Sequence, residues 1–497
     1  MDERIGRVGA LLLFGFLLVA AALGYWQVFQ VVPAEQATRD PRLYELEARV
    51  QRGDIVDRRG KALATTESTT RGFVRRYPAA AAAPVVGYPS SRYGRGGLEE
   101  RFDDRLSGQR STGILGRLQD ELFHRPAVGS QIRSTLDLEI QQVATSAMGD
   151  AAGAIVALDP IDGDVLALVS APTFDPGAID GSIDRLRNDL SRPLFNRATQ
   201  GLYPPGSTFK VVTAAAVVEN KVVDLKREFR CTRPIQIDGL AVDCRNHAHL
   251  AVVDFYEAFA WSCNRTFALA GLGLGYPGQV DLSDNPARPY PWADRGIGPS
   301  ADRLREMAGK FGLERTVPFD LPVEPSRLAD PGQEMFPSLL GQTAFGQGQL
   351  ALTPLQMALI IGTVANGGLM PQPHLGLEAL GPGGARNDLR PVPAPQSRVI
   401  SAETAAELNH MLEMSVDHAY AQKAKIAGVK VAGKTGTAEV GDGKTPHSWF
   451  IGYAPSDKPR VAVAVVLENR GSGAEAATIA AQRVLQTALA VYRPANR

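Results

Sequence analysis

The stretch YPPGSTFKVVTAAAVVE, residues 203–219, decides the fold class of this chain and points to its chemistry. Its Pro-Pro-Gly sequence ends whatever structure precedes it, and the apolar periodic run that follows predicts a helix. Ser207 therefore lies at the N-terminus of that helix, where unbonded N–H groups and the helix dipole favour developing negative charge. Lys210 follows three residues later, so its side chain shares a helix face with Ser207.

The spacing of Ser207 and Lys210 allows a neutral lysine amine to accept the serine proton. An ordinary lysine has a pKa of about 10.4, so this role requires a decrease of roughly three units, or about 4 kcal/mol. Burial and a second nearby cation can lower a lysine pKa by that amount. Taken alone, however, a Ser-x-x-Lys sequence is more often a helix cap followed by a solvated lysine.

Two further motifs favour the chemical interpretation over the helix cap. One lies between two helical patterns and the other in a predicted strand; they are Ser262-Cys263-Asn264 and Lys434-Thr435-Gly436-Thr437. The order Ser-x-x-Lys, Ser-x-Asn, Lys-Thr-Gly is the motif set of penicillin-binding proteins and serine β-lactamases. The chain therefore resembles these enzymes at three separate points.

Segments outside the three motifs resemble class B penicillin-binding proteins, which are monofunctional D,D-transpeptidases. RGDIVDRRG at 52–60 resembles their juxtamembrane pattern, and GLE at 97–99 with the following RFDDRLSG resembles their second N-terminal motif. Matches to their transpeptidase domain are GQGQLALTPLQMA at 346–358, ANGG at 365–368 and HSWFIGYAP at 447–455. The resemblance covers nearly the whole chain, departs around 277–299, and is strongest to the penicillin-binding protein A group of actinobacteria.

This resemblance implies a peptidoglycan crosslinking reaction through a serine acyl-enzyme, which β-lactams also form. It makes Ser207 the nucleophile on the carbonyl between the two terminal D-Ala residues of a stem peptide, Lys210 its general base and Ser262 a proton relay. It assigns the oxyanion hole to the backbone N–H groups of Ser207 and Thr437, and substrate binding to Asn264, Lys434, Thr435, Gly436 and Thr437. No metal or organic cofactor is expected, because the protein supplies nucleophile, base and oxyanion hole.

Several other interpretations of the same residues stay open. His447, close to the Lys-Thr-Gly motif, is either a general base or a residue that orders the strand that follows. The enzyme is alternatively a D,D-carboxypeptidase or β-lactamase-type hydrolase, in which water resolves the acyl-enzyme. A third function is that of a non-catalytic activator of a membrane glycan polymerase. By resemblance, the partner polymerase belongs to the SEDS family (shape, elongation, division and sporulation).

The arrangement of patterns along the chain predicts an α+β fold. Strand-like runs lie at 152–170 and 429–469, and mostly helical patterns lie between them. One antiparallel sheet flanked by helices, closed by its two chain ends and carrying an inserted helical subdomain, accounts for this order. We expect a cytoplasmic N-terminus at 1–7, a transmembrane helix at 8–32, a small N-terminal pedestal of the dimerisation type at 33–150 and the penicillin-binding transpeptidase domain at 151–493.

The segment Val8–Val32 contains no Asp, Glu, Lys or Arg and is long enough to cross a bilayer. Arg4 and Arg7 precede it, which predicts a single-pass cell-membrane protein with a cytoplasmic N-terminus and an extracytoplasmic catalytic domain. Tyr25 and Trp26 suit the outer interface. The alternative is a cleavable signal peptide ending at the Ala-x-Ala sequence of residues 20–22.

The cysteines fit a compartment outside the cytoplasm. Cys231 and Cys244 are close in sequence and predict a disulfide. Because His247 and His249 follow at once, a metal site is an alternative, and two free thiols are another. Cys263 is expected to be buried and unpaired.

The overall charge bears on possible partners. Lys plus Arg number 53 and Asp plus Glu number 53, so the net charge is zero. This balance argues against a nucleic-acid binder, which normally carries a basic excess. The expected partners are peptidoglycan stem peptides, β-lactam antibiotics and the membrane.

Overall fold

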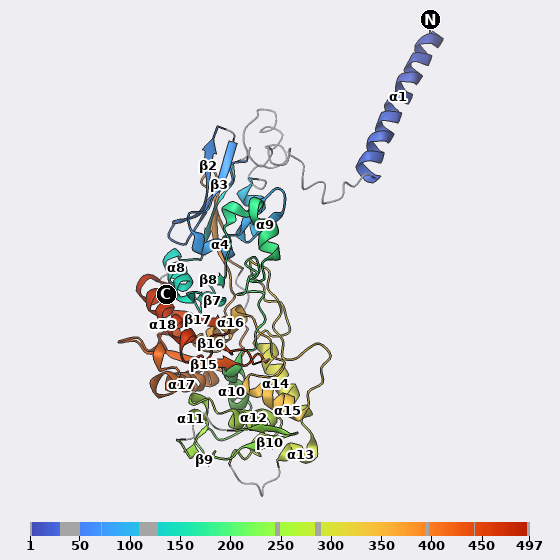
Figure 1. Cartoon of the computed structure of the whole chain (residues 1–497). Coiled ribbons are helices and arrows are strands. Elements are labelled where there is room, and N and C mark those ends of the chain that lie inside the picture. Colours follow the sequence, from blue (N-terminus) through green and yellow to red (C-terminus); the bar gives the residue numbers. More distant parts are fainter. Residues whose placement is uncertain are drawn as a thin grey trace.

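The computed structural model describes residues 2–29, 50–70, 72–108, 128–243, 249–283, 290–392, 397–441 and 443–494. The body that follows the N-terminal helix is elongated. Strands from the first part of the chain lie at one end, a layered sheet lies in the middle and a helical region lies at the other end (Figure 1).

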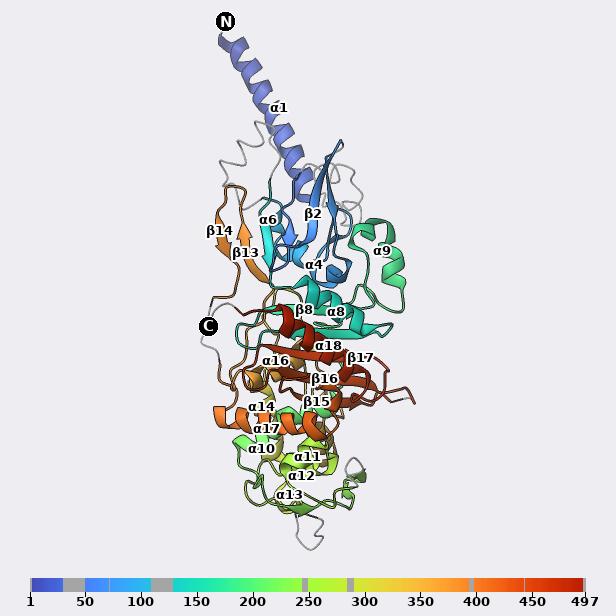
Figure 2. The same cartoon turned by 90° about the vertical axis from the view of Figure 1, so that its left-hand side faces the viewer.

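A five-stranded antiparallel sheet forms the middle layer (Figure 2). Its strands run in the order β15 (Ala432–Ala438), β16 (His447–Ala454), β17 (Val461–Leu467), β7 (Gly153–Leu158) and β8 (Val165–Ala171). β17 pairs with β7, with Val465 opposite Ile155. Strands from the two ends of the predicted transpeptidase region therefore meet at the centre of the sheet, which confirms the predicted α+β fold.

Helices cover both faces of this sheet. α8 (Leu138–Met148) and α18 (Ala476–Val491) pack on one face, whereas α16 (Pro354–Ala365) and α17 (Ala402–His418) lie on the other. In β17, Val463 and Val465 belong to the α8–α18 core, and Val466 belongs to the opposite core. Because both faces are buried, the strand is a continuous apolar run without polar alternation.

A second sheet of six strands forms the N-terminal part of the body. Its order is β14 (Arg386–Asp388), β13 (Gly376–Leu380), β6 (Gln131–Ser134), β1 (Ile55–Val56), β2 (Ala62–Thr69) and β3 (Gly72–Arg76). β13 and β14 come from the middle of the sequence, and β13 pairs with β6. The predicted domain boundary at residue 150 differs from the structure in two ways. It leaves β13 and β14 out of the N-terminal sheet. It also places α8 in the pedestal, although α8 packs on the five-stranded sheet.

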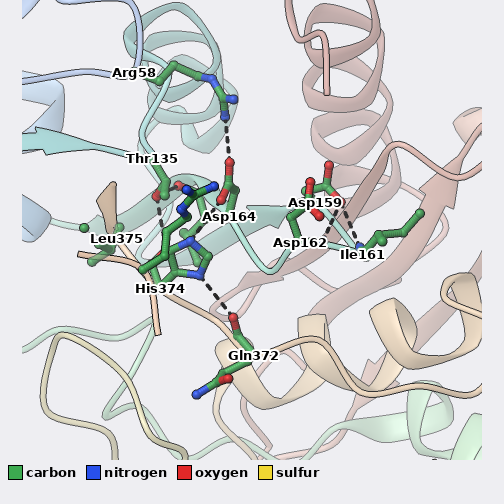
Figure 3. A network of polar contacts seen from close by, with 12 residues as sticks. Arg58, Thr135, Asp159, Ile161, Asp162, Asp164, Gln372, His374 and Leu375 are labelled. Carbon is green, nitrogen blue, oxygen red and sulfur yellow. Dashed lines mark hydrogen bonds and ion pairs between the residues drawn. The ribbon is translucent and has the colours of Figure 1, made fainter. Parts of the chain in front are cut away.

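Ion pairs connect residues within the N-terminal segment and also connect this segment to the five-stranded sheet. Arg52 binds the fully buried carboxylate of Glu99 at 2.8 Å and Asp103 at 2.7 Å. Arg58 binds Asp164 of the β7–β8 turn at 3.3 Å, and Asp164 in turn lies 3.0 Å from the Nε2 atom of His374 (Figure 3). The arginine-rich stretch that begins at Arg52 is thus an internal salt-bridged structure.

The helical region packs below the sheet. Its main helices are α10 (Lys210–Glu219), α11 (Phe255–Ala260), α12 (Asn264–Leu272), α14 (Gly298–Lys310) and α15 (Pro337–Phe345). The remaining short elements are η1 (Ala80–Ala82), α4 (Ala83–Val86), β4 (Tyr88–Ser90), β5 (Gly94–Gly96), α5 (Leu98–Arg101), α6 (Asp103–Leu106), η2 (Pro176–Ala178), α9 (Ile179–Asn188), η3 (Gly206–Phe209), β9 (Phe229–Arg230), β10 (Ile235–Ile237), β11 (Leu240–Val242), β12 (Val252–Val253), α13 (Pro291–Arg295) and η5 (Gln422–Ala424). α13 lies within the divergent stretch 277–299.

The N-terminal helix α1 spans Asp2–Phe29. Its segment Gly6–Tyr25 is long and apolar enough to cross a membrane, with a mean hydropathy of 2.3. The predicted segment continues to Val32, and its last three residues lie outside the described part of the chain. One apolar N-terminal helix fits the expected single-pass anchor.

Candidate active site

The nucleophile turn is formed by η3, which leads directly into α10. Gly206 has φ +56°, and a Cβ atom there would lie 2.6 Å from the carbonyl oxygen of Thr437, so only glycine allows this contact. Gly346, which ends α15 with φ +98°, packs against Gly206 from the other side. Ser207 is thereby held between the edge strand β15 and the end of α15.

Lys210 is fully buried and lies at the centre of the three motifs. Its Nζ atom is 2.9 Å from the Oγ atom of Ser207 and 3.0 Å from the Oγ atom of Ser262. It also donates to the carbonyl oxygen of Ser262 at 2.8 Å and to the Oδ1 atom of Asn264 at 2.7 Å. All of these partners are uncharged, so the ammonium form gains no ion pair from them.

Burial lowers the pKa of Lys210 well below the usual lysine range, and the positive charge of Lys434 lowers it further. Burial also lowers the pKa of Lys434, to about 7. A buried amine without a carboxylate partner favours its neutral form. The geometry therefore supplies a neutral amine within hydrogen-bond distance of a serine hydroxyl, which is the requirement for a general base.

The turn between α11 and α12 presents the second motif. Ser262 has φ +61°, a left-handed conformation that is uncommon for a residue with a side chain and that is found at functional sites. Asn264 begins α12, and the side chain of Cys263 caps this helix by accepting from the backbone N–H of Thr266. The strained residue is thus fixed between two helices, with its hydroxyl directed at Lys210.

The third motif lies on β15, the edge strand of the five-stranded sheet. Lys434 is fully buried, whereas Thr435 and Thr437 line the open cleft above Ser207. A Cβ atom on Gly436 would lie 2.8 Å from the carbonyl oxygen of Pro205, so glycine lets the strand approach the nucleophile turn. Lys434 is not among the residues that line the cleft.

The cleft brings most of the predicted site residues together and adds others. Ser207, Ser262, Asn264, Thr435 and Thr437 all line it. Residues that the sequence interpretation did not name also line it: Phe345, Gln347, Tyr420, Glu439, Ser472 and Ala474. The Nε2 atom of Gln347 donates to the carbonyl oxygen of Thr437 at 3.3 Å. Gln347 belongs to the GQGQ segment at 346–349, so this motif could have identified it as a site residue. Tyr420 and Ser472 lie in segments that carry no motif.

His447 begins β16 and does not line the cleft. Its Nδ1 atom accepts from the backbone N–H of Asn469 at 3.1 Å, and its ring meets that of Tyr203 edge to face. These contacts favour the role of ordering the strand over that of a general base.

The sulfur atoms of two cysteines meet close to the second motif. Cys231 is disulfide-bonded, and Cys263 is buried and keeps its thiol. Their Sγ atoms lie 3.4 Å apart. Cys244 and His247 lie outside the described residues, so the Cys231–Cys244 disulfide stays a prediction.

The family models and the relatives that match this chain are penicillin-binding proteins and peptidoglycan D,D-transpeptidases. The model of the penicillin-binding protein transpeptidase domain matches residues 153–486, and that of the penicillin-binding protein A dimerisation domain matches residues 52–132. The peptidoglycan D,D-transpeptidase PbpA of Mycolicibacterium smegmatis is 33% identical, over 95% of this chain and 94% of its own. The peptidoglycan D,D-transpeptidase MrdA of Escherichia coli is 30% identical, over 78% of this chain and 63% of its own.

A solved structure shares the fold. The imipenem acyl-enzyme of penicillin-binding protein A from Mycobacterium tuberculosis has a TM-score of 0.77 and is 33% identical. The match covers 90% of this chain and all of that one.

Proposed function

The chain belongs to the penicillin-binding protein transpeptidase family, and from this premise we propose that it is a peptidoglycan D,D-transpeptidase with Ser207 as its nucleophile. The observation that carries the assignment is the fully buried Lys210 amine, 2.9 Å from the Ser207 hydroxyl. Ser207 attacks the carbonyl between the terminal D-Ala residues of a stem peptide, and Lys210 takes its proton. β-Lactams acylate the same hydroxyl.

The other motif residues complete this reaction. Ser262 relays a proton between Lys210, Lys434 and the leaving amine, a role supported by its 3.0 Å contact with Lys210. Thr435 and Thr437 bind the substrate carboxylate from the cleft side of β15, together with Lys434. Asn264 binds the substrate backbone, while Gly436 lets β15 approach the nucleophile. Backbone N–H groups of Ser207 and Thr437 stabilise the oxyanion.

An amine on a neighbouring stem peptide then resolves the acyl-enzyme and forms the crosslink. We propose that α1 anchors the enzyme in the cell membrane with its N-terminus in the cytoplasm, so that the reaction occurs outside. The N-terminal module covers 33–150 without α8, which packs on the five-stranded sheet, and it gains β13 and β14; the rest of 151–493 forms the transpeptidase domain. A SEDS-family glycan polymerase is the proposed membrane partner, supported by family membership and the anchor.

Mass spectrometry of the intact chain with penicillin G tests the nucleophile. One penicilloyl group is expected on the peptide that contains Ser207, and none on the Ser207→Ala variant. Incubation with a stem pentapeptide and an acceptor amine then separates transfer from hydrolysis. Crosslinked dimer is expected, whereas release of D-Ala without dimer would make the enzyme a hydrolase.

A further inference from the structure

A second cavity, of about 390 Å³, lies on the catalytic part of the molecule and shares no lining residue with the active-site cleft. It opens where the end of α14, the start of α16 and the segment 370–373 come together. Its walls are largely apolar and include Val317, Leu359 and Met370. A concave, apolar site with a few polar groups is the usual form of a small-molecule site.

One of those polar groups is a buried amide with an unused acceptor. Gln356 lines the cavity and is 1% exposed, and its Nε2 atom donates to the carbonyl oxygen of Phe311 at 2.7 Å. This bond fixes the amide orientation, and within the described residues the Oε1 atom has no hydrogen-bond partner. Gly312 also lines the cavity and lies beside this amide. A buried acceptor without a donor is unfavourable, and a ligand N–H or O–H group removes that cost.

The charges on the rim have one sign. Lys310 and Arg315 line the cavity, and among the described residues no acidic side chain does. Lys310 contacts Glu306 one helical turn away, but both side chains are about half exposed, and such surface pairs are weak. An acidic group entering the cavity therefore meets two cations at the rim and an amide acceptor at the floor.

The walls of the cavity are preformed. The carbonyl oxygen of Gln372 contacts the Nδ1 atom of His374 at 3.2 Å, and Asp164 and Arg58 continue this network toward the N-terminal module (Figure 3). A Cβ atom on Gly163 would lie 2.0 Å from the same carbonyl oxygen, so the segment is closely packed on the β7–β8 turn. The backbone of this wall is therefore held in place before a ligand binds.

We propose that this cavity binds a small amphipathic anion, namely an apolar and preferably aromatic body that carries one acidic group and one N–H or O–H donor. The acidic group faces Lys310 and Arg315. The donor reaches the Oε1 atom of Gln356, and the apolar body fills the space beside Leu359 and Met370.

Calorimetric titration of the full chain in lipid nanodiscs tests the proposal with three probes. Indole-3-acetate has the body, the acid and the N–H donor; naphthalene-1-acetate lacks the donor; tryptamine replaces the acid by a cation. Ser207 is first blocked with penicillin G so that carboxylates cannot enter the catalytic cleft. This step rests on the proposed function; if penicillin does not label the chain, that function fails, while the comparison of cavity variants still tests this site.

Indole-3-acetate is expected to bind about fivefold more tightly than naphthalene-1-acetate, the ratio that one hydrogen bond supplies. Gln356→Met should abolish that difference without weakening the naphthalene probe, a result that misfolding cannot mimic. Lys310→Glu and Arg315→Glu should each weaken both acids severalfold, whereas Lys458→Glu, at an exposed lysine that does not line the cavity, should not. Equal binding of all three probes, or acid binding unchanged in both rim variants, would overturn the proposal.

Discussion

Replacing Lys434 by methionine should stabilise the protein by an amount that depends on pH. Lys434 is fully buried, and burial lowers its pKa from 10.5 to about 7. Between these two values the unfolded chain binds a proton that the folded chain releases, so wild-type stability rises as the pH rises. Methionine has a similar length, is apolar and does not titrate, so the variant lacks this dependence.

The size of the expected stability change follows from the pKa shift of Lys434. Lowering a lysine pKa by about 3.5 units destabilises the folded state by about 4 kcal/mol at pH 7 and about 2 kcal/mol at pH 9. The stability difference between variant and wild type should therefore shrink by about 2 kcal/mol from pH 7 to pH 9. Packing changes caused by the substitution cancel in this comparison, because they do not vary with pH.

Urea unfolding followed by tryptophan fluorescence measures this difference, since Trp449 lies buried on the neighbouring strand β16. The matched control is Lys458→Met, the same substitution at an exposed lysine. A Lys434→Met difference that is equal at pH 7 and pH 9 would refute the reasoning. It would mean that Lys434 stays charged in the folded protein across this range.

Three other expectations follow from the same structure. Lys210→Ala should slow β-lactam acylation by two to four orders of magnitude, roughly the contribution of a positioned general base; stopped-flow labelling with a fluorescent penicillin measures it, and a rate within about tenfold of wild type would direct attention to His447. Cys231 and Cys244 should appear as one linked peptide pair in non-reducing mapping of the exported protein, and stoichiometric zinc or two alkylated thiols would contradict the pairing. Deleting residues 1–32 should leave acylation of the remaining chain nearly unchanged while crosslinking in cells falls; full complementation by the secreted form would show that the anchor is not needed.

The sequence predicted the core of the site because that core depends on local pattern. A Pro-Pro-Gly stop before an apolar run places Ser207 at a helix start, and the three-residue spacing places Lys210 beside it. The strand that carries Lys434 and the helices on either side of Ser262 could be predicted from local pattern in the same way. The closing of the sheet by β7 and β17 followed from apolar runs at both ends of one region.

Other features could not be predicted because they arise from long-range packing. β13 and β14 are short and partly polar, and β14 is fully exposed, so no apolar pattern marks their return to the N-terminal sheet. Tyr420 and Ser472 reach the cleft from loops whose position depends on the whole fold. The left-handed conformation of Ser262 is set by the two helices around it rather than by its own side chain.

The polar partners of Lys210 explain why its site is built without a carboxylate. An aspartate or glutamate at hydrogen-bond distance would satisfy the buried amine, but it would also raise the pKa of Lys210 and keep the amine protonated. Neutral acceptors on Ser207, Ser262 and Asn264 hold the amine in place without that effect. The second cation, Lys434, acts in the same direction as burial. Stability is thus reduced at this position for the same reason that the amine can act as a base, and the strained Ser262 adds to that cost at the same point.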